Sequence, residues 1–250
     1  MKKVVVIVLF AVIGFFIYSI VFQTREQPPV ISYTFDFEEM DKDFWLVGQW
    51  ENYKRSYDLI SLKDGILKMT SDVPEARPYV LSRPIEIRSG DVITLKRKVK
   101  ITHGDRLFAG GLAIYQTNSI ELVPERADGS WFTSMGDGIA LVEYSYDLSP
   151  LQKRPGKDVV RFLAADWDYN ENFKLIPPFY DEWVEESLSY DTRSNQITYK
   201  INNTEYKLNS YPIDQNNIRF LMHAYGEGAG NSIEVDWVEI TVINKKNRMQ

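Results

Sequence analysis

The stretch SIEVDWVEITVI, residues 232–243, decides the fold. Apolar and polar residues alternate over most of its length, which is the period of a β-strand with one buried face. We expect this strand to pair with the first strand of the domain, near residues 33–37, so that a sandwich closes on itself. The pairing would join the two ends of one all-β domain.

Other segments repeat the pattern. Residues 66–69 follow the turn signal Lys63-Asp64-Gly65, and residues 92–101 alternate apolar and polar side chains. The runs 197–201 and 204–208 are separated by Asn202-Asn203, residues that tolerate the positive φ of a two-residue hairpin. No helical period and no internal repeat occurs after residue 32, so we predict antiparallel β structure throughout.

Composition excludes several classes of protein. The 250-residue chain has no cysteine, which rules out disulfides, thiolate metal sites and a cysteine nucleophile. Its net charge is −6, and its main basic cluster, at residues 96–100, lies inside a strand-like run. We therefore expect no nucleic-acid partner. His103 and His223 lack metal-binding spacing, so neither predicts a metal site.

The N-terminus predicts a membrane anchor. Lys2 and Lys3 precede about 19 apolar residues, 4–22, close to the length that crosses a bilayer as a helix. No small-residue cleavage site follows, and the flanking lysines favour a cytoplasmic N-terminus. We predict a single-pass protein of the cell membrane with its C-terminal domain extracytoplasmic. The alternative is a cleaved signal and a secreted protein.

The chain accordingly divides into an anchor at 1–23, a spacer at 24–31, a β-sandwich at 32–244 and a polar tail at 245–250. Several segments of the sandwich resemble the bacterial laminarinases and lichenases, glycoside hydrolases with the concanavalin A-like jelly roll. The resemblance implies a two-sheet antiparallel jelly-roll sandwich. The segments that carry it are 35–38, 61–69, Trp183 with Ser189-Tyr190-Asp191, 197–203 and 233–240.

In that family a calcium ion commonly joins the first and last strands. The resemblance places its ligands here at the Asp236 carboxylate and at backbone carbonyls near Glu39 and Gly65. Calcium takes six to eight oxygen ligands, so such a set, completed by water, is chemically reasonable. The alternative is that Asp236 merely sits at a strand edge and Gly65 makes a turn.

The catalytic motif is where the chain departs from the family. Retaining members carry Glu-x-Asp-x-x-Glu on one strand, and the matching segment here has Gly138, Ala140 and Glu143. A lone carboxylate cannot run a two-step displacement. The resemblance therefore implies a sandwich without this activity, with Glu143 as the one weak catalytic candidate.

Aromatic residues in polar surroundings suit sugar rings, whose apolar faces stack on them. Trp50, Trp131 and Trp167 are the candidates for ligand contact, whereas Trp45, Trp183 and Trp237 are assigned to the core.

Tyr144 and Arg97 are two further candidates for ligand contact. Tyr144 adjoins Glu143 in sequence, and Arg97 occupies an apolar position of its strand, so it should be buried with a carboxylate partner such as Glu143. If that pair faces a groove it marks a ligand site, and if it faces the core it is structural.

Three functions remain open. The first is a non-catalytic, cell-surface module that binds carbohydrate or a cell-wall polymer. The second is a glycoside hydrolase or polysaccharide lyase of a divergent family, using Glu143, Asp166 or Asp168. The third is a domain that binds a protein partner at the cell surface.

Overall fold

The structure is a computed structural model of the chain. It describes residues 30–50, 59–71, 78–102, 108–117, 120–126, 129–135, 138–146, 158–164, 172–210, 212–213, 216–224 and 231–244. The apolar stretch 4–22 and the tail 245–250 lie outside these residues. Within the described part of the chain, no helix is both long enough and apolar enough to cross a bilayer.

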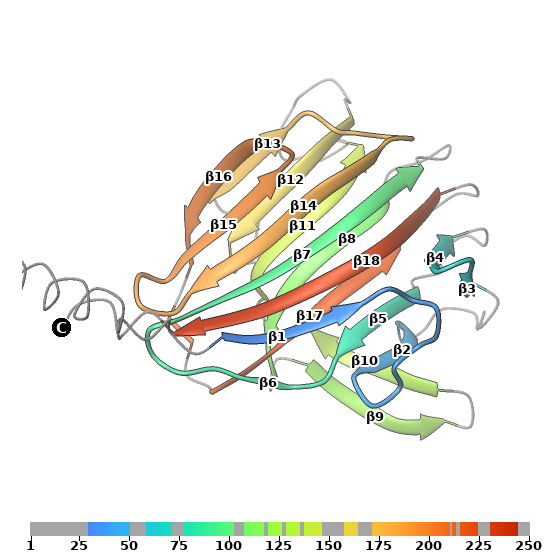
Figure 1. Ribbon diagram of the computed structural model, residues 1–250, viewed down its shortest axis with the longest axis horizontal. Coiled ribbons are helices and arrows are strands. Elements are labelled where there is room, and N and C mark those ends of the chain that lie inside the picture. The colour runs from blue at the N-terminus through green and yellow to red at the C-terminus, as the bar shows by residue number, and fades with distance from the viewer. Residues whose placement is uncertain are drawn as a thin grey trace, which may run out of the picture.

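The described strands form two sheets that face each other (Figure 1). Every strand pair is antiparallel except β2 with β10. The first sheet, sheet A, has the order β16(Thr204–Asn209), β15(Gln196–Ile201), β14(Trp183–Asp191), β7(Asp91–Thr102), β18(Asn231–Asn244), β4(Ile66–Ser71), β3(Ile60–Lys63), with β1(Val30–Phe35) also on β18.

The second sheet, sheet B, faces sheet A across the core. Its order is β13(Phe173–Ile176), β12(Asp158–Ala164), β11(Gly138–Tyr146), β8(Phe108–Gln116), β17(Asn217–Ala224), β5(Pro78–Ser82), β2(Trp45–Trp50), β10(Gly129–Met135), β9(Ile120–Arg126), with β6(Ile85–Glu86) also on β17. The predicted two-sheet jelly-roll sandwich is thus confirmed.

Strand β18 holds sheet A together. One of its edges pairs with β7, while the other pairs first with β4, through Val235, and then with β1, from Val238 onward. Tyr33 lies opposite Ile240, which confirms the predicted pairing of the last strand with the first. The change of partner coincides with a bulge between Val235 and Trp237.

The main core fills the space between the sheets. In β7, alternate residues are fully buried, and Ile93, Leu95, Val99 and Ile101 have no exposed surface. Burying one such side chain contributes about 1.5–3 kcal/mol relative to leaving it exposed. Because successive side chains point to opposite faces, the intervening residues of β7 form the outer face of sheet A.

Two turns follow the sequence signals. Lys63 and Ile66 pair across Asp64 and Gly65, which have φ values of 53° and 72°, as a tight hairpin requires. Ile201 and Thr204 pair across the predicted two-residue turn, in which Asn202 has a φ of 50°.

The assignments of tryptophans to the core are confirmed only in part. Trp45 is 2% exposed and lies in the core. Trp183 is 40% exposed, because its neighbour Val184 takes the inward position of β14. Trp237 is half-buried, since the bulge turns it to the outer face of sheet A beside Asp236.

Candidate functional site

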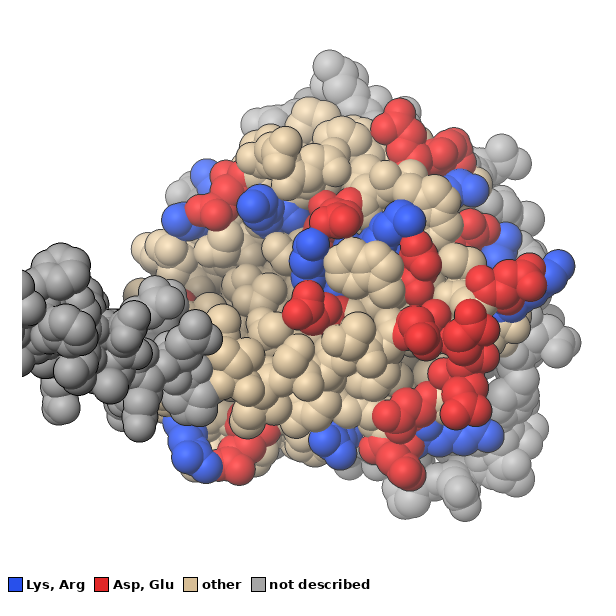
Figure 2. Space-filling model, in the orientation of Figure 1, with Lys and Arg blue, Asp and Glu red and all other residues tan. Residues whose placement is uncertain are grey.

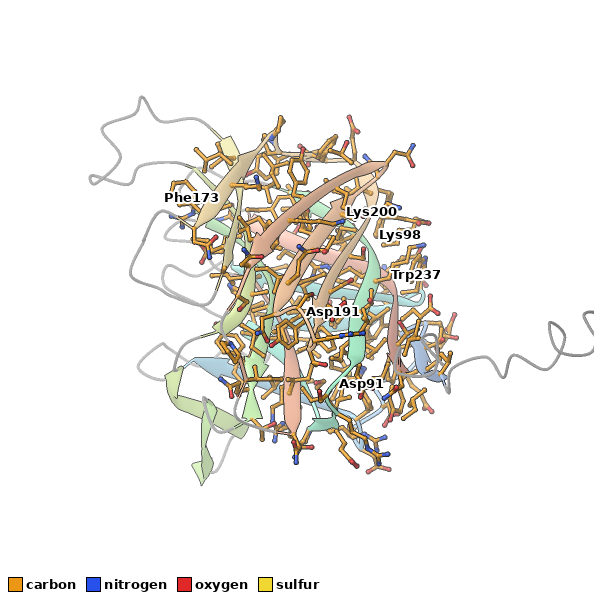
Figure 3. The ribbon with its side chains drawn as sticks, turned by 90° about the vertical axis from the view of Figure 1, so that its left-hand side faces the viewer. Asp91, Lys98, Phe173, Asp191, Lys200 and Trp237 are labelled. Atoms are coloured by element: carbon orange, nitrogen blue, oxygen red, sulfur yellow. The ribbon has the colours of Figure 1, made fainter. Side chains whose placement is uncertain are left out.

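The middle strands of sheet B, from β12 to β5, are largely buried on both faces where the structure describes their side chains, unlike sheet A. A second apolar cluster lies on the side of sheet B that faces away from the main core. Figure 3 shows the sandwich from the side, with Phe173, which packs on this cluster, opposite Lys98 and Trp237 on the outer face of sheet A. We call this region the outer layer of sheet B.

One row of the outer layer is apolar. Cross-strand pairs place its members side by side on one face, running from β13 across the sheet to β2. We call it the leucine row, and its members are Phe173, Leu163, Leu141, Ala113, Leu221, Leu81 and Leu46.

The neighbouring row is polar. It lies two residues along each strand, so its side chains share the face of the leucine row. Its members, here called the polar row, are Arg161, Glu143, Gly111, His223 and Tyr79 in successive strands. All four side chains are buried, and Tyr79 has no exposed surface.

An ion pair anchors one end of the polar row. Arg161 Nη2 donates to Glu143 Oε2 at 2.6 Å, and the two side chains are 5% and 10% exposed. Gly111 separates Glu143 from His223, and a Cβ there would lie 2.0 Å from the carbonyl oxygen of Val142. The close approach of β8 to β11 therefore requires glycine at this position.

A third row brings Tyr115 beside Arg219. The Tyr115 ring lies over Gly138, where a Cβ would be 3.2 Å from its Cε1 atom. Burial raises the pKa of the Tyr115 phenol well above its ordinary value, and the nearby Glu143 carboxylate raises it further. The phenol therefore stays neutral and remains a hydrogen-bond donor at physiological pH.

Two buried polar atoms of this row lack partners. Among the residues that the structure describes, nothing hydrogen-bonds to the Tyr115 hydroxyl or to Arg219 Nε. Arg219 Nη1 donates to the Ser82 carbonyl at 2.9 Å. Burial lowers the pKa of Arg219, whereas Tyr79 raises it. A buried polar group without a partner costs about 1–3 kcal/mol, so both atoms are suited to a partner from outside the chain.

The candidate catalytic segment lies in β11, but its alignment with the glycosidase motif is wrong at one position. A register shift between Gly138 and Ala140 turns Ala140 toward Ile114 and the main core. Of the three motif positions, only Gly138 and Glu143 face the outer layer of sheet B. Among the described residues of this layer, Glu143 has no second carboxylate beside it.

The interpretation of Arg97 and Tyr144 as ligand contacts is corrected by the structure. Both side chains lie between the sheets with no exposed surface. The carboxylate partner of Arg97 is Glu186, in the neighbouring strand β14, and not Glu143. Tyr144 Oη also donates to Glu186, at 2.9 Å. These groups are structural.

The structure describes the backbone positions of only two of the three tryptophans that were predicted to contact a ligand. Trp50 and Trp131 lie in the adjacent strands β2 and β10, where Trp50 pairs with Phe132 and Gln49 with Trp131. Their side chains are not described. Trp167, Asp166, Asp168 and His103 lie outside the described residues.

The structure shows no group of metal-binding side chains, among the described residues, at the positions predicted to bind calcium. Asp236 Oδ2 lies 2.6 Å from Lys98 Nζ on the outer face of sheet A. Gly65 adjoins Glu38 and the Asp36 carbonyl, while Glu39 lines a cavity of about 600 Å³ in the loop after β1. No three acidic or histidine side chains of the described residues gather to hold a metal ion.

Sequence reasoning missed the outer layer of sheet B as a unit. The signal was present in runs such as Leu112-Ala113-Ile114-Tyr115 and Phe220-Leu221-Met222, which are apolar without alternation. Continuous apolar runs of this length are typical of strands that are buried on both faces.

Comparisons with known proteins agree with this architecture. No family model and no curated protein matches the chain. A Lotus tetragonolobus seed lectin superposes with a TM-score of 0.60 at 11% identity, covering 86% of this chain and 100% of the lectin. Basic winged bean lectin with Tn-antigen gives 0.58 at 9% identity, with 86% and 98% covered.

A third similar structure is the exoplasmic/lumenal domain of VIP36 in its Ca²⁺/Man₃GlcNAc-bound form. It gives a TM-score of 0.56 at 10% identity, with 84% of this chain and 87% of that domain covered. These likenesses extend over most of each chain, although the sequences differ at about nine positions in ten. The chain has the concanavalin A-like jelly-roll fold that these lectins share.

Proposed function

We propose that the protein is a non-catalytic carbohydrate-binding domain whose site is the outer layer of sheet B. The apolar stretch 4–22 holds the domain at the outer side of the cell membrane, where a cell-wall polymer or surface glycan is within reach. The observation that carries the proposal is the buried Tyr115 hydroxyl, which has no hydrogen-bond partner among the described residues and lies beside Arg219, on the face of sheet B that also carries Glu143.

The chemistry of this layer suits a sugar. Hydroxyl groups of a glycan both donate and accept hydrogen bonds, while the faces of its rings are apolar. Tyr115 and Arg219 offer donors, Glu143 offers an acceptor, and the leucine row offers an apolar floor. Leu46, Phe173 and Arg219 are half-buried and form the margin through which a ligand would enter.

The similar structures support the ligand class. Two of them were determined with a glycan, Tn-antigen for the winged bean lectin and Man₃GlcNAc for VIP36. We extend only the class of ligand to this chain, because at about 10% identity the likeness is one of fold.

A polysaccharide-cleaving enzyme is the second candidate. It is favoured by the position of Glu143 and His223 on either side of Gly111, where both could exchange protons with one bound ligand. Turnover separates the two functions, because a binding domain retains its polysaccharide unchanged.

The test is a glycan-array and polysaccharide-gel screen on the full chain in detergent micelles. We expect specific retention that weakens at least tenfold in Tyr115→Phe and Glu143→Gln. Tyr206→Phe is the matched control, because it removes one hydroxyl from β16 of the other sheet. Retained circular dichroism would show that the variants fold.

Three other outcomes decide against the proposal. Product release that is lost in Glu143→Gln would establish the enzyme. Retention that is equal in all variants would place the site elsewhere. A blank screen with folded protein would leave a domain that binds a protein partner.

A further inference from the structure

Both ends of the β domain lie at one end of the sandwich. Val30 begins β1 opposite Ile243 near the end of β18, and Ile243 also pairs with Val92 at the start of β7. Figure 1 shows β1 starting and β18 ending on the same side. Val30 and Ile31 are 53% and 51% exposed, which is unusual for large apolar residues in the described part of this domain.

Two turns complete this end. The segment between β6 and β7 contacts the turn after β14, because Gly90 N donates to Thr192 Oγ1 at 2.9 Å and Thr192 N donates to the Asp91 carbonyl at 3.0 Å. Figure 3 shows this end facing the viewer, with Asp91 and Asp191 labelled. We call it the terminal end, formed by Val30, Ile31, Ile243 and residues 87–92 and 191–195.

The formal charges of the terminal end balance, with Arg88 and Arg193 against Asp91 and Asp191, but the two arginines are the more exposed. Arg88 and Arg193 are exposed. Asp91, by contrast, is 4% exposed and accepts hydrogen bonds from Asn244 Nδ2 at 2.6 Å and from Arg88 N at 2.7 Å. Glu86 is paired with Arg88 at 3.1 Å. Within the terminal end, the exposed charged residues of the described chain are thus Arg88 and Arg193, beside the apolar pair Val30 and Ile31.

The chain outside the described residues limits where this end can lie. Seven residues, 23–29, separate the apolar stretch from Val30, and fully extended they reach about 25 Å. Beyond Asn244 the sequence continues with Lys245, Lys246 and Arg248. The tether and these basic residues thus both join the domain at its terminal end.

We propose that the terminal end rests on the lipid surface of the membrane that holds residues 4–22. This inference depends on the tether in the proposed function, but not on the carbohydrate site. Val30 and Ile31 enter the interfacial region, and Arg88 and Arg193 contact lipid phosphates. Apolar side chains flanked by cations are the combination that binds an anionic lipid surface.

The contact fixes the orientation of the sandwich. The strands run away from the bilayer, and the Asn202-Asn203 turn, at the opposite end of β15 from residues 191–195, is held far from it. The outer layer of sheet B then faces sideways, parallel to the membrane. A glycan could approach it without passing under the domain.

The absence of cysteine makes the test direct. A single fluorophore is attached to Ile31→Cys or, as control, to Asn203→Cys in the full chain, which is then incorporated into vesicles containing anionic lipid and a headgroup quencher. We expect severalfold stronger quenching at residue 31 than at residue 203. Equal quenching at both positions in protein that floats with the vesicles would overturn the contact and leave the tether standing.

A charge variant tests the same contact independently. The double substitution Arg88→Gln and Arg193→Gln should reduce quenching at residue 31 in anionic vesicles, and high salt should act likewise. Lys200→Gln is the matched control, because Lys200 is exposed on β15. Quenching that is unchanged in the double variant would overturn the role of these arginines. Failure of the full chain to float would remove the tether and the lipid contact together.

Discussion

Arg97 and Glu186 form an ion pair in the middle of the sandwich, with no exposed side-chain surface on either residue. Arg97 Nε donates to Glu186 Oε1 at 2.7 Å. The other carboxylate oxygen accepts hydrogen bonds from Tyr199 at 2.6 Å and from Tyr144 at 2.9 Å. Tyr144 comes from sheet B, so this cluster joins the two sheets through polar contacts inside an apolar core.

Removing one member of this ion pair should lower the free energy of unfolding far more than replacing both members with apolar residues. We expect Glu186→Leu to lower the free energy of unfolding by about 3–5 kcal/mol, since it leaves the Arg97 guanidinium buried without a counterion. The double variant Arg97→Met/Glu186→Leu should recover most of this loss. Urea denaturation of the parent, of Glu186→Leu, of Arg97→Met and of the double variant measures both effects, and additive losses would contradict the account.

Alkaline pH should unfold the protein cooperatively. Burial raises the pKa values of Tyr115, Tyr144 and Tyr199 well above 10, and that of Tyr190 to about 12. The unfolded chain ionises its tyrosines near pH 10. Stability from these phenols is therefore complete below about pH 10 and is lost as pH rises through the folded-state values.

Tyrosine ionisation, followed by absorbance at 295 nm, and unfolding, followed by circular dichroism, can be measured in one alkaline titration. The exposed tyrosines should ionise first, and the buried ones only together with the loss of β-sheet signal. Tyr144→Phe should alter the second step, whereas Tyr206→Phe should not. Ionisation of all 15 tyrosines near pH 10 in folded protein would argue against the burial that we describe.

The strand pattern could be predicted from sequence because it depends on local alternation. The pairing of β18 with β1, the two hairpin turns and the burial of Arg97 all follow from which residues share one face of a strand. The partner of Arg97 could not be predicted in this way. Glu186 and Glu143 are both on strands, and only the order of strands in the sheets decides which of them adjoins β7.

The positions of Asp236 and Trp237 on the outer face of sheet A could not be predicted from the alternation of apolar and polar residues either. A single bulge in β18 puts Asp236 and Trp237 together opposite β7, so Trp237 leaves the core and Asp236 meets Lys98. Lys96 lies 5.0 Å from the centre of the Trp237 ring. Charged groups of both signs are interspersed over this face in Figure 2. The alternation changes phase at the bulge, where Trp237 and Val238 are adjacent apolar residues, and alternation alone does not decide which of the two is buried.

Calcium should have no effect on thermal stability. Lys98 Nζ already neutralises the Asp236 carboxylate, and an ion would have to displace it. We expect the same Tm in millimolar calcium as in chelator, and a change of about 1 kcal/mol or less for Asp236→Asn, because the pair is partly exposed. A calcium-dependent rise in Tm that Asp236→Asn abolishes would restore the metal site.

Strands β8 and β11 approach each other closely at Gly111, so the stability of the protein should depend on a glycine at this position. Gly111→Ala should destabilise the protein by more than the roughly 1 kcal/mol typical of point mutations, because the new Cβ would lie 2.0 Å from the Val142 carbonyl and neither backbone can yield without breaking the sheet. Gly138→Ala is the matched control, since its Cβ would lie 3.2 Å from the Tyr115 ring, whose side chain can shift. Urea denaturation ranks the two variants. If Gly111→Ala were as stable as the parent while Gly138→Ala were not, β8 and β11 could not lie as close as the structure places them, and the polar row built across Gly111 would lose its basis.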